Sequence, residues 1–311
     1  MADPGYHRPP VLFTPHLETI YPALFRKVNV AKPVRERINT PDDDFLDLDY
    51  YRQGANHCVI ISHGLEGNST RAYIRGMAKA MLDAGFDVIA WNYRGCSGEL
   101  NRQRRFYHSG ATDDLATVVS HAAAKYPAIS LVGFSLGGNL TLKYLGDGQH
   151  HPAISKAVAF SVPMDLYTSC LEISKPGNWI YARRFLKSLK LKVRTKAAVR
   201  TDLPMADLDT VNTLMEFDNV FTGPVHGFKD AMDYYTRCSS LPVLPNINVP
   251  TLVVNAKNDP FLSSACYPAA SAASRSVVLE YPEHGGHVGF ARFGQKGLYW
   301  SDMRAVAFLA H

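Results

Sequence analysis

The chain contains 311 residues, of which 46% are hydrophobic and 20% are charged. This is the composition of an ordinary globular protein, long enough for one large domain or two small ones. The formal net charge of +5 is mild, and acidic and basic residues alternate through most of the sequence, which argues against a nucleic-acid partner. No apolar run approaches the ~20 residues that a membrane-spanning helix needs, so we expect no transmembrane segment.

The first half of the chain alternates short β-rich runs with longer helical patterns. Strands are expected at 58–62, 87–91, 129–132 and 156–161, and helices at 70–84, 111–125 and 136–146. Repeated strand–helix alternation favours a mostly parallel sheet with helices on its faces. The sequence therefore predicts an α/β fold.

The same alternation returns near the end of the chain. Strands are expected at 251–256 and 276–281, with helical segments at 262–274 and 297–310. Between the two halves the alternation is lost, and helices and loops take its place. We therefore predict one core built from residues 1–162 and 246–311, with residues 163–245 inserted as a helical cap.

The first part of the predicted cap is strongly basic. Residues 175–200 carry nine Lys or Arg side chains and no acidic one. Apolar residues recur there at near-helical spacing, namely Trp179, Phe185, Leu186, Leu189 and Val193. This pattern predicts an amphipathic, basic helix. The favoured interpretation is a solvated cationic face, and the alternative is peripheral contact with anionic lipid or an acidic substrate.

Five cysteines lie far apart, and none forms a C-x-x-C pair: Cys58, Cys96, Cys170, Cys238 and Cys266. Neither a disulfide framework nor a thiolate metal site is indicated by this spacing. The first ten residues, MADPGYHRPP, lack the basic and then apolar pattern of a secretory signal. We therefore expect reduced thiols and a cytoplasmic location.

Residues 133–137 read GFSLG and match the pattern G-x-S-x-G. The pattern alone is weak, but an expected strand precedes it and an expected helix follows it. A reversal this sharp forces the serine into a strained backbone conformation and brings neighbouring chain close, which requires glycine on either side. The setting predicts Ser135 as a nucleophile.

A serine nucleophile needs a base within hydrogen-bond reach and a carboxylate that orients the base. Functional groups gather at the carboxyl ends of parallel strands, and Asp259 and His287 each follow an expected strand. The order Ser135, Asp259, His287 is that of the α/β-hydrolases. Asp165 is the competing acid and His284 the competing base.

Acyl transfer also requires hydrogen-bond donors for the oxyanion. After the strand at 58–62, the sequence HGLEG opens a loop, and the Leu65 amide is one candidate donor. The Leu136 amide, directly after the nucleophile, is the other. His63 is interpreted as a structural histidine of this loop.

Metal and cofactor sites are not indicated. The twelve histidines are scattered, with neither H-x-x-x-H nor H-E-x-x-H spacing. Dinucleotide-binding and Walker A patterns are absent as well. We therefore expect catalysis without a cofactor or metal.

The motifs together resemble the YheT-like family of α/β-hydrolases over nearly the whole chain. In order they are PHLETIYP (15–22), TPDDDFLDLDY (40–50), HGLEGNSTRAYIRGMA (63–78), WNYRGCSGELNR (91–102), YHSGATDDL (107–115), GFSLGGN (133–139), NDPF (258–261) and EHGGHVGF (283–290). Glu18 departs from the N-terminal signature, which usually has glutamine there. The resemblance implies a capped α/β-hydrolase core with Ser135, Asp259 and His287 as the catalytic triad.

The leading functional hypothesis is a serine hydrolase that cleaves carboxylic esters through an acyl-enzyme. The resemblance implies substrates between short-chain esters and acylglycerol-type lipids or phospholipids. One alternative is an acyltransferase that passes the acyl group to an alcohol. A second alternative, from another class, is a non-catalytic binding protein on a hydrolase fold.

Overall fold

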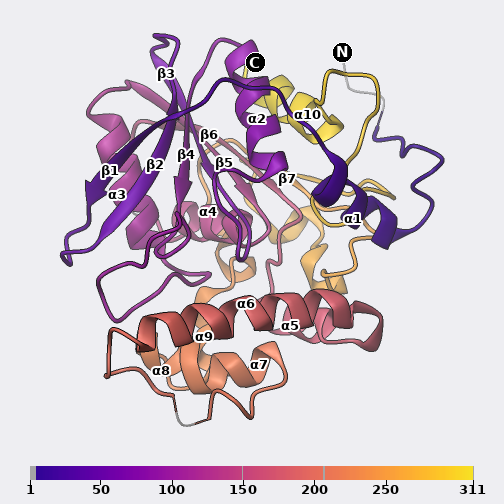
Figure 1. Ribbon diagram of the computed structural model, residues 1–311. Helices are drawn as coiled ribbons and strands as arrows, with labels where there is room; N and C mark the ends of the chain where they lie inside the picture. Colours follow the sequence, from indigo (N-terminus) through magenta and orange to yellow (C-terminus); the bar gives the residue numbers. More distant parts are fainter. Residues whose placement is uncertain (1–4, 149, 206, 311) are drawn as a thin grey trace.

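Eight strands form a single sheet at the centre of the molecule (Figure 1). The computed structural model describes residues 5–148, 150–205 and 207–310. The strands are β1 (Val34–Asn39), β2 (Phe45–Tyr51), β3 (His57–Ser62), β4 (Asp87–Asn92), β5 (Ala128–Phe134), β6 (Ile154–Phe160), β7 (Thr251–Val254) and β8 (Val277–Glu280). Their spatial order is β1-β2-β4-β3-β5-β6-β7-β8. Only the β1–β2 and β2–β4 pairs are antiparallel, so the predicted mostly parallel sheet is confirmed.

The inner parts of the central strands are apolar, as in residues 58–61 of β3 and 88–91 of β4, because both faces of the sheet are covered. In β3, Cys58 and Ile60 pack into one core layer, whereas Val59 and Ile61 pack into the other. Helices α3 (Thr112–Ala123) and α4 (Leu136–Gly146) contribute to the first layer, and α2 (Ala72–Asp83) and α10 (Trp300–Leu309) to the second. The sheet is thus enclosed between two helical layers, as the strand–helix alternation predicts.

The chain between the end of β6 and the start of β7 forms a separate group of helices, which is the lower layer in Figure 1. It comprises α5 (Leu166–Ile173), η1 (Pro176–Asn178), α6 (Trp179–Ala197), α7 (Leu214–Phe217), η2 (Asp218–Thr222), α8 (Gly223–His226), α9 (Ala231–Cys238) and η3 (Leu241–Asn246). Helices α5 to α9 share an apolar cluster of their own, which includes Leu186, Val193, Phe217 and Tyr235, whereas Leu244 of η3 packs into the sheet core. The element η2 is a π-helical turn.

Two local expectations are wrong. The segment 262–274 holds only two short 3₁₀ turns, η4 (Ser264–Cys266) and η5 (Ala270–Ala272). Pro268 lies between them and removes an amide donor while it biases Tyr267 away from helical backbone angles. Trp179 does not join the apolar face of α6 but is 55% exposed, because this first residue of the helix lies outside the apolar cluster that holds Leu186 and Val193.

Within the described ranges, no helix is long and apolar enough to cross a membrane. The five cysteines are all free and buried.

Candidate active site

Ser135 occupies the sharp turn between β5 and α4. Its φ of 52° and ψ of −119° lie outside the regions that a residue with a side chain ordinarily adopts. Such a conformation costs about 1–3 kcal/mol and persists only where its surroundings hold it. Here the Ser135 amide donates to the Phe160 carbonyl at 2.9 Å, which ties the turn to the neighbouring strand β6.

The glycines beside Ser135 are required by close backbone approach. A Cβ atom on Gly133 would lie 2.3 Å from the Gly137 carbonyl oxygen, and one on Gly137 would lie 2.4 Å from that of Ser62. Neither neighbour is a side chain that could rotate away. The sequence pattern around Ser135 therefore has a steric cause.

The structure brings together the three residues that the sequence nominates as a triad. His287 Nε2 lies 2.9 Å from Ser135 Oγ, and His287 Nδ1 lies 2.8 Å from Asp259 Oδ2. Asp259 follows β7 and His287 follows β8. With Nδ1–H donating to the carboxylate, the Nε2 lone pair faces the serine hydroxyl and can accept its proton.

The environment of Asp259 and His287 limits their movement. Asp259 is buried, and its Oδ1 accepts the Phe261 amide at 2.9 Å. The Phe261 ring packs against the imidazole of His287, with 4.2 Å between the ring centroids. The imidazole of His287 is thus held between the Phe261 ring and the Asp259 carboxylate.

The two competing candidates have other contacts. Asp165 begins α5 as its N-cap, where Oδ1 accepts the Thr168 amide at 2.8 Å. His284 Nδ1 lies 3.5 Å from Asn258 Nδ2. Neither side chain is hydrogen-bonded to Ser135 or His287 in the part of the chain that the structure describes.

Leu65 and Leu136, whose amides are the predicted oxyanion donors, both line a cavity beside Ser135. Leu136 is the first residue of α4, so its amide has no acceptor one turn earlier in the helix. The Leu65 amide donates to no protein acceptor among the residues described. Among the described residues neither amide donates to an acceptor outside α4, as the predicted oxyanion role requires.

The N-terminal helix α1 (Pro15–Phe25) supports the two loops that carry Asp259 and His287. Sequence reasoning missed this support. Glu18 is buried, and its carboxylate accepts the Asn258 side-chain amide at 2.7 Å and the Gly285 amide at 2.6 Å. Thr19 Oγ1 accepts the His287 amide at 2.9 Å. The signal in the sequence was the departure at Glu18 within PHLETIYP, and it did not reveal the partners, which lie 240 and 267 positions away.

Glu66, next to the predicted oxyanion donor, is bound to helix α6. Its Oε1 accepts from Lys192 Nζ at 2.7 Å and from the Tyr107 hydroxyl at 2.7 Å, and Ser188 on α6 donates to Oε2. Burial raises the pKa of Glu66, but the Lys192 charge and these hydrogen bonds lower it below its ordinary value. The carboxylate thus stays ionised between the loop and α6.

The imidazole of His63 is fully buried and has a structural place in the same loop. Nδ1 lies 2.8 Å from the Gly64 carbonyl and Nε2 accepts the Tyr93 amide at 3.3 Å, an arrangement that suits the neutral ring. Burial lowers its pKa to about 3. These contacts agree with the structural role predicted for it.

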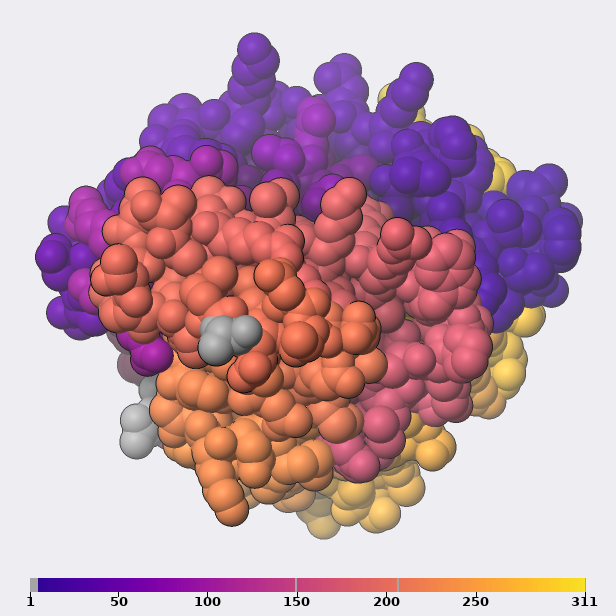
Figure 2. Space-filling model, turned by 60° about the horizontal axis from the view of Figure 1, so that its bottom comes forward, coloured from indigo at the N-terminus to yellow at the C-terminus, as the bar shows by residue number. Residues whose placement is uncertain are grey.

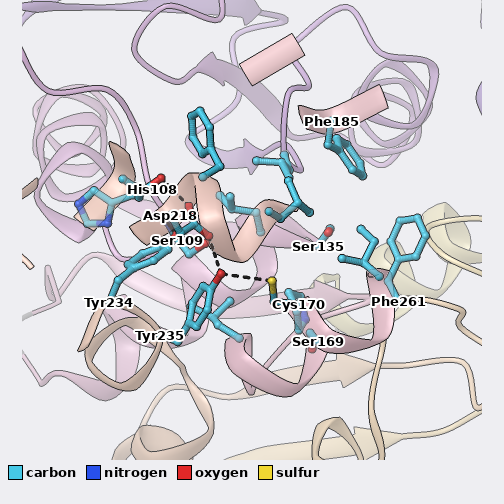
Figure 3. A pocket seen from close by; sticks show the side chains of 18 of the residues that line it. His108, Ser109, Ser135, Ser169, Cys170, Phe185, Asp218, Tyr234, Tyr235 and Phe261 are labelled. Atoms are coloured by element: carbon cyan, nitrogen blue, oxygen red, sulfur yellow. Dashed lines mark hydrogen bonds between the residues drawn. The ribbon is translucent and has the colours of Figure 1, made fainter. Parts of the chain in front are cut away.

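The cavity beside Ser135 has a volume of about 150 Å³ and is drawn in Figure 3. Most of its wall is apolar, with contributions from Leu166, Ile173, Leu189, Leu214 and Phe217. Residues of the sheet core and of the segment between β6 and β7 line it together. Within the described ranges, no group of three or more His, Cys, Asp or Glu side chains could hold a metal ion.

Comparison with known proteins agrees with this architecture. The family model described as an alpha/beta hydrolase fold matches residues 58–291. The chain therefore belongs to the α/β-hydrolase fold family, and its similarity to YheT assigns it to the YheT-like branch.

The chain is 36% identical to YheT of Escherichia coli strain K12, whose name gives esterase as a provisional activity, over 88% of this chain and 84% of that protein. It is 29% identical to human phospholipase ABHD3, over 88% of this chain and 74% of ABHD3. Among solved structures, esterase Pf2001 of Pyrococcus furiosus shares the fold with a TM-score of 0.59 and 17% identity, covering 92% of this chain and 97% of Pf2001.

Proposed function

We propose that this chain is a serine hydrolase of carboxylic esters, with Ser135 as nucleophile, His287 as general base and Asp259 as the orienting acid. The observation that carries the proposal is the continuous hydrogen-bonded chain from Asp259 through His287 to the strained Ser135. Esterase, lipase and phospholipase names among the relatives support the same class of reaction.

In the proposed reaction, His287 Nε2 takes the hydroxyl proton as Ser135 Oγ attacks the ester carbonyl carbon. Asp259 stabilises the imidazolium that forms. The carbonyl oxygen becomes an oxyanion, which the Leu65 and Leu136 amides hold, each donor contributing about 3 kcal/mol to the lowering of the barrier. Collapse releases the alcohol, which takes its proton from His287.

The second half of the reaction removes the acyl group from Ser135. His287 takes a proton from water, the water oxygen attacks the acyl carbon, and Ser135 leaves with the proton returned by His287. The apolar wall of the cavity suits short- to medium-chain acyl esters or acylglycerol-type lipids.

We further propose that residues 163–245 act as a cap inserted between core segments 1–162 and 246–311. Support comes from the cavity, because Ser135 and His287 of the core share it with α5, α6 and α7. Changes within this segment would then alter acyl-chain preference without altering the triad.

The outer face of α6 is proposed to contact an anionic lipid surface. Ile180, Arg183, Arg184, Lys187 and Leu191 are exposed at spacings that place them on one helix face, and Figure 2 looks onto this side of the molecule. Exposed apolar side chains among cations are typical of interfacial helices. Two other cations of α6 are held internally, since Lys192 binds Glu66 and Lys196 Nζ donates to Asn101 at 2.8 Å. A cytoplasmic location remains part of the proposal, in keeping with the free cysteines.

Vesicle sedimentation tests the lipid contact. The protein should bind vesicles that contain phosphatidylglycerol more tightly than phosphatidylcholine vesicles, and the triple Gln substitution of Arg183, Arg184 and Lys187 should remove the difference. The matched control replaces three exposed cations elsewhere, Lys27, Lys257 and Arg275, with Gln. If both triple variants lose the preference for phosphatidylglycerol vesicles to the same extent, the effect is one of general charge, and the proposal is contradicted.

Hydrolysis of p-nitrophenyl butyrate tests the proposed reaction. The variant Ser135→Ala should lose at least about 10³-fold in kcat, because no other group takes over the nucleophile's role. Circular dichroism and the thermal midpoint should match those of the wild type. Comparable rates in the folded variant would refute the proposal.

A further inference from the structure

The cavity beside Ser135 has a polar end as well as a catalytic one. Figure 3 shows Asp218 and Ser109 on one side of the cavity, and Ser135 with Phe261 on the other. Asp218 begins the π-helical turn η2, an element that is rare in proteins and frequent at functional sites. The proposed ester cleavage at Ser135 makes no use of this end.

Two hydroxyl groups hold the Asp218 carboxylate in place. Thr222 Oγ1 donates to Oδ1 at 2.5 Å, and the Tyr235 hydroxyl donates to Oδ2 at 2.7 Å. Tyr235 has a single hydroxyl proton, so the Cys170 thiol, 3.2 Å from the same oxygen, acts as the donor in that contact. A chain of hydrogen bonds therefore runs from Cys170 through Tyr235 to Asp218.

Asp218 keeps unused capacity to accept hydrogen bonds. A carboxylate accepts up to about four, and two donors of the protein reach this one. No Lys, Arg or His forms an ion pair with it among the residues that the structure describes. Burial raises its pKa to about 6, although the hydrogen bonds from Thr222 and Tyr235 act in the opposite direction. A buried carboxylate in this state is stabilised by one more donor from the cavity.

We propose that Asp218, held in place by Thr222 and Tyr235, binds a hydroxyl group on the substrate, at the end of the ester arm that lies farthest from the reacting carbonyl. The inference rests on the proposed ester hydrolysis at Ser135. A hydroxyl suits the site because it donates to Asp218 while its oxygen can accept from a neighbouring group, and it enters the apolar cavity at a smaller desolvation cost than an ammonium group.

Paired substrates test the proposal. The ratio of kcat/KM is measured for p-nitrophenyl alkanoates of increasing chain length and for their ω-hydroxy counterparts, and likewise for alkyl acetates and ω-hydroxyalkyl acetates. At the length that reaches Asp218, the hydroxylated ester should be preferred by about tenfold or more, since its unhydroxylated analogue leaves the buried acceptor without its donor. No preference at any length in either series would overturn the proposal.

Variants assign the preference to Asp218. Asp218→Leu should bring the ratio to about one, and Asp218→Asn should lower it severalfold, because a neutral acceptor forms the weaker hydrogen bond. The matched control, Asp209→Leu, removes an exposed carboxylate of the same segment and should keep the wild-type ratio. If the Leu variant does not fold, the Asn variant decides. An unchanged ratio there overturns the proposal.

Binding without turnover separates this proposal from the proposed function. Titration calorimetry with folded Ser135→Ala compares the hydroxylated and unhydroxylated esters directly. Tighter binding of the hydroxylated ester supports the Asp218 site even if the wild type cleaves no ester, a result that would overturn only the proposed function. Equal binding, together with wild-type turnover that shows no preference, overturns the Asp218 site and leaves the proposed function standing.

Discussion

Lys192 Nζ lies 2.7 Å from Glu66 Oε1 and joins helix α6 to the loop that carries the Leu65 amide. Both side chains are largely buried, and the two residues lie 126 positions apart in the sequence. Glu66, the residue next to a proposed oxyanion donor, is thus held by helix α6. We therefore expect Lys192 and Glu66 to act as positioning residues, which affect the reaction through the loop and not through contact with the ester.

Replacing Lys192 with Met should lower the free energy of unfolding by about 3 kcal/mol, because the Glu66 carboxylate is left buried without its cation. In ester hydrolysis kcat should fall, with KM changed less, as the Leu65 amide loses its fixed position. Urea denaturation and steady-state kinetics measure the two effects. The control on the same helix, Arg194→Met, breaks an exposed pair with Asp209 and should cost less than about 1 kcal/mol. Equal costs would contradict this account.

Removal of the Glu18 carboxylate should affect catalysis more than binding. Glu18→Ala leaves the amides of Asn258 and Gly285 without their acceptor, and the resulting misplacement should lower kcat about 10- to 100-fold with little change in KM. Glu18→Gln keeps one acceptor oxygen and should restore part of the loss. The exposed Glu99 serves as the control for the Ala substitution. A loss confined to KM would argue against a positioning role.

Glycine at position 137 should be irreplaceable for steric reasons. A Cβ atom there would lie 2.4 Å from the Ser62 carbonyl oxygen and 2.6 Å from that of His63, so Gly137→Ala should destabilise the fold by about 3 kcal/mol. Gly177 has open space at its Cβ position, and Gly177→Ala should change stability by less than about 1 kcal/mol. Thermal unfolding of the two variants is the measurement, and similar midpoints would refute the steric argument.

Stability should fall in mild acid, in part through His63. Its pKa is about 3 in the folded protein and ordinarily 6.5, so below pH 6.5 the unfolded chain binds a proton that the folded protein does not. The free energy of unfolding therefore decreases as the pH drops from 6.5 towards 3, by at most about 1.4 kcal/mol per pH unit for this residue. Urea denaturation at a series of pH values gives the free energy of unfolding as a function of pH. Its slope between pH 6.5 and 3 should be shallower for His63→Gln than for the wild type, and identical slopes would contradict the contribution assigned to His63.

Strands β3 to β8 and the residues at their ends were predictable because their signals are local, whereas β1 and β2 were not among the expected strands. Strand β5 is apolar apart from Ser130, and the GFSLG turn at its end carries its steric requirements in five residues. The helix expected over 262–274 failed because a single Pro268 outweighed a weak helical pattern. These outcomes follow from short-range rules.

The supporting contacts were not predictable, because they depend on residues far apart in the sequence. Glu18 meets Gly285, and Glu66 meets Lys192, only after the sheet has formed. Asp218 carried no sequence signal at all, since its meaning lies in the cavity that it lines and in its hydroxyl partners. Such contacts become visible only in three dimensions.

Covalent labelling tests the central claim, that Ser135 is an activated nucleophile, most directly. The folded protein is treated with a fluorophosphonate probe, and the modified residue is located by peptide mass spectrometry. We predict one label, on Ser135, absent in Ser135→Ala and strongly slowed in His287→Ala. Labelling at another residue, or no labelling of the folded wild-type protein, would contradict the account.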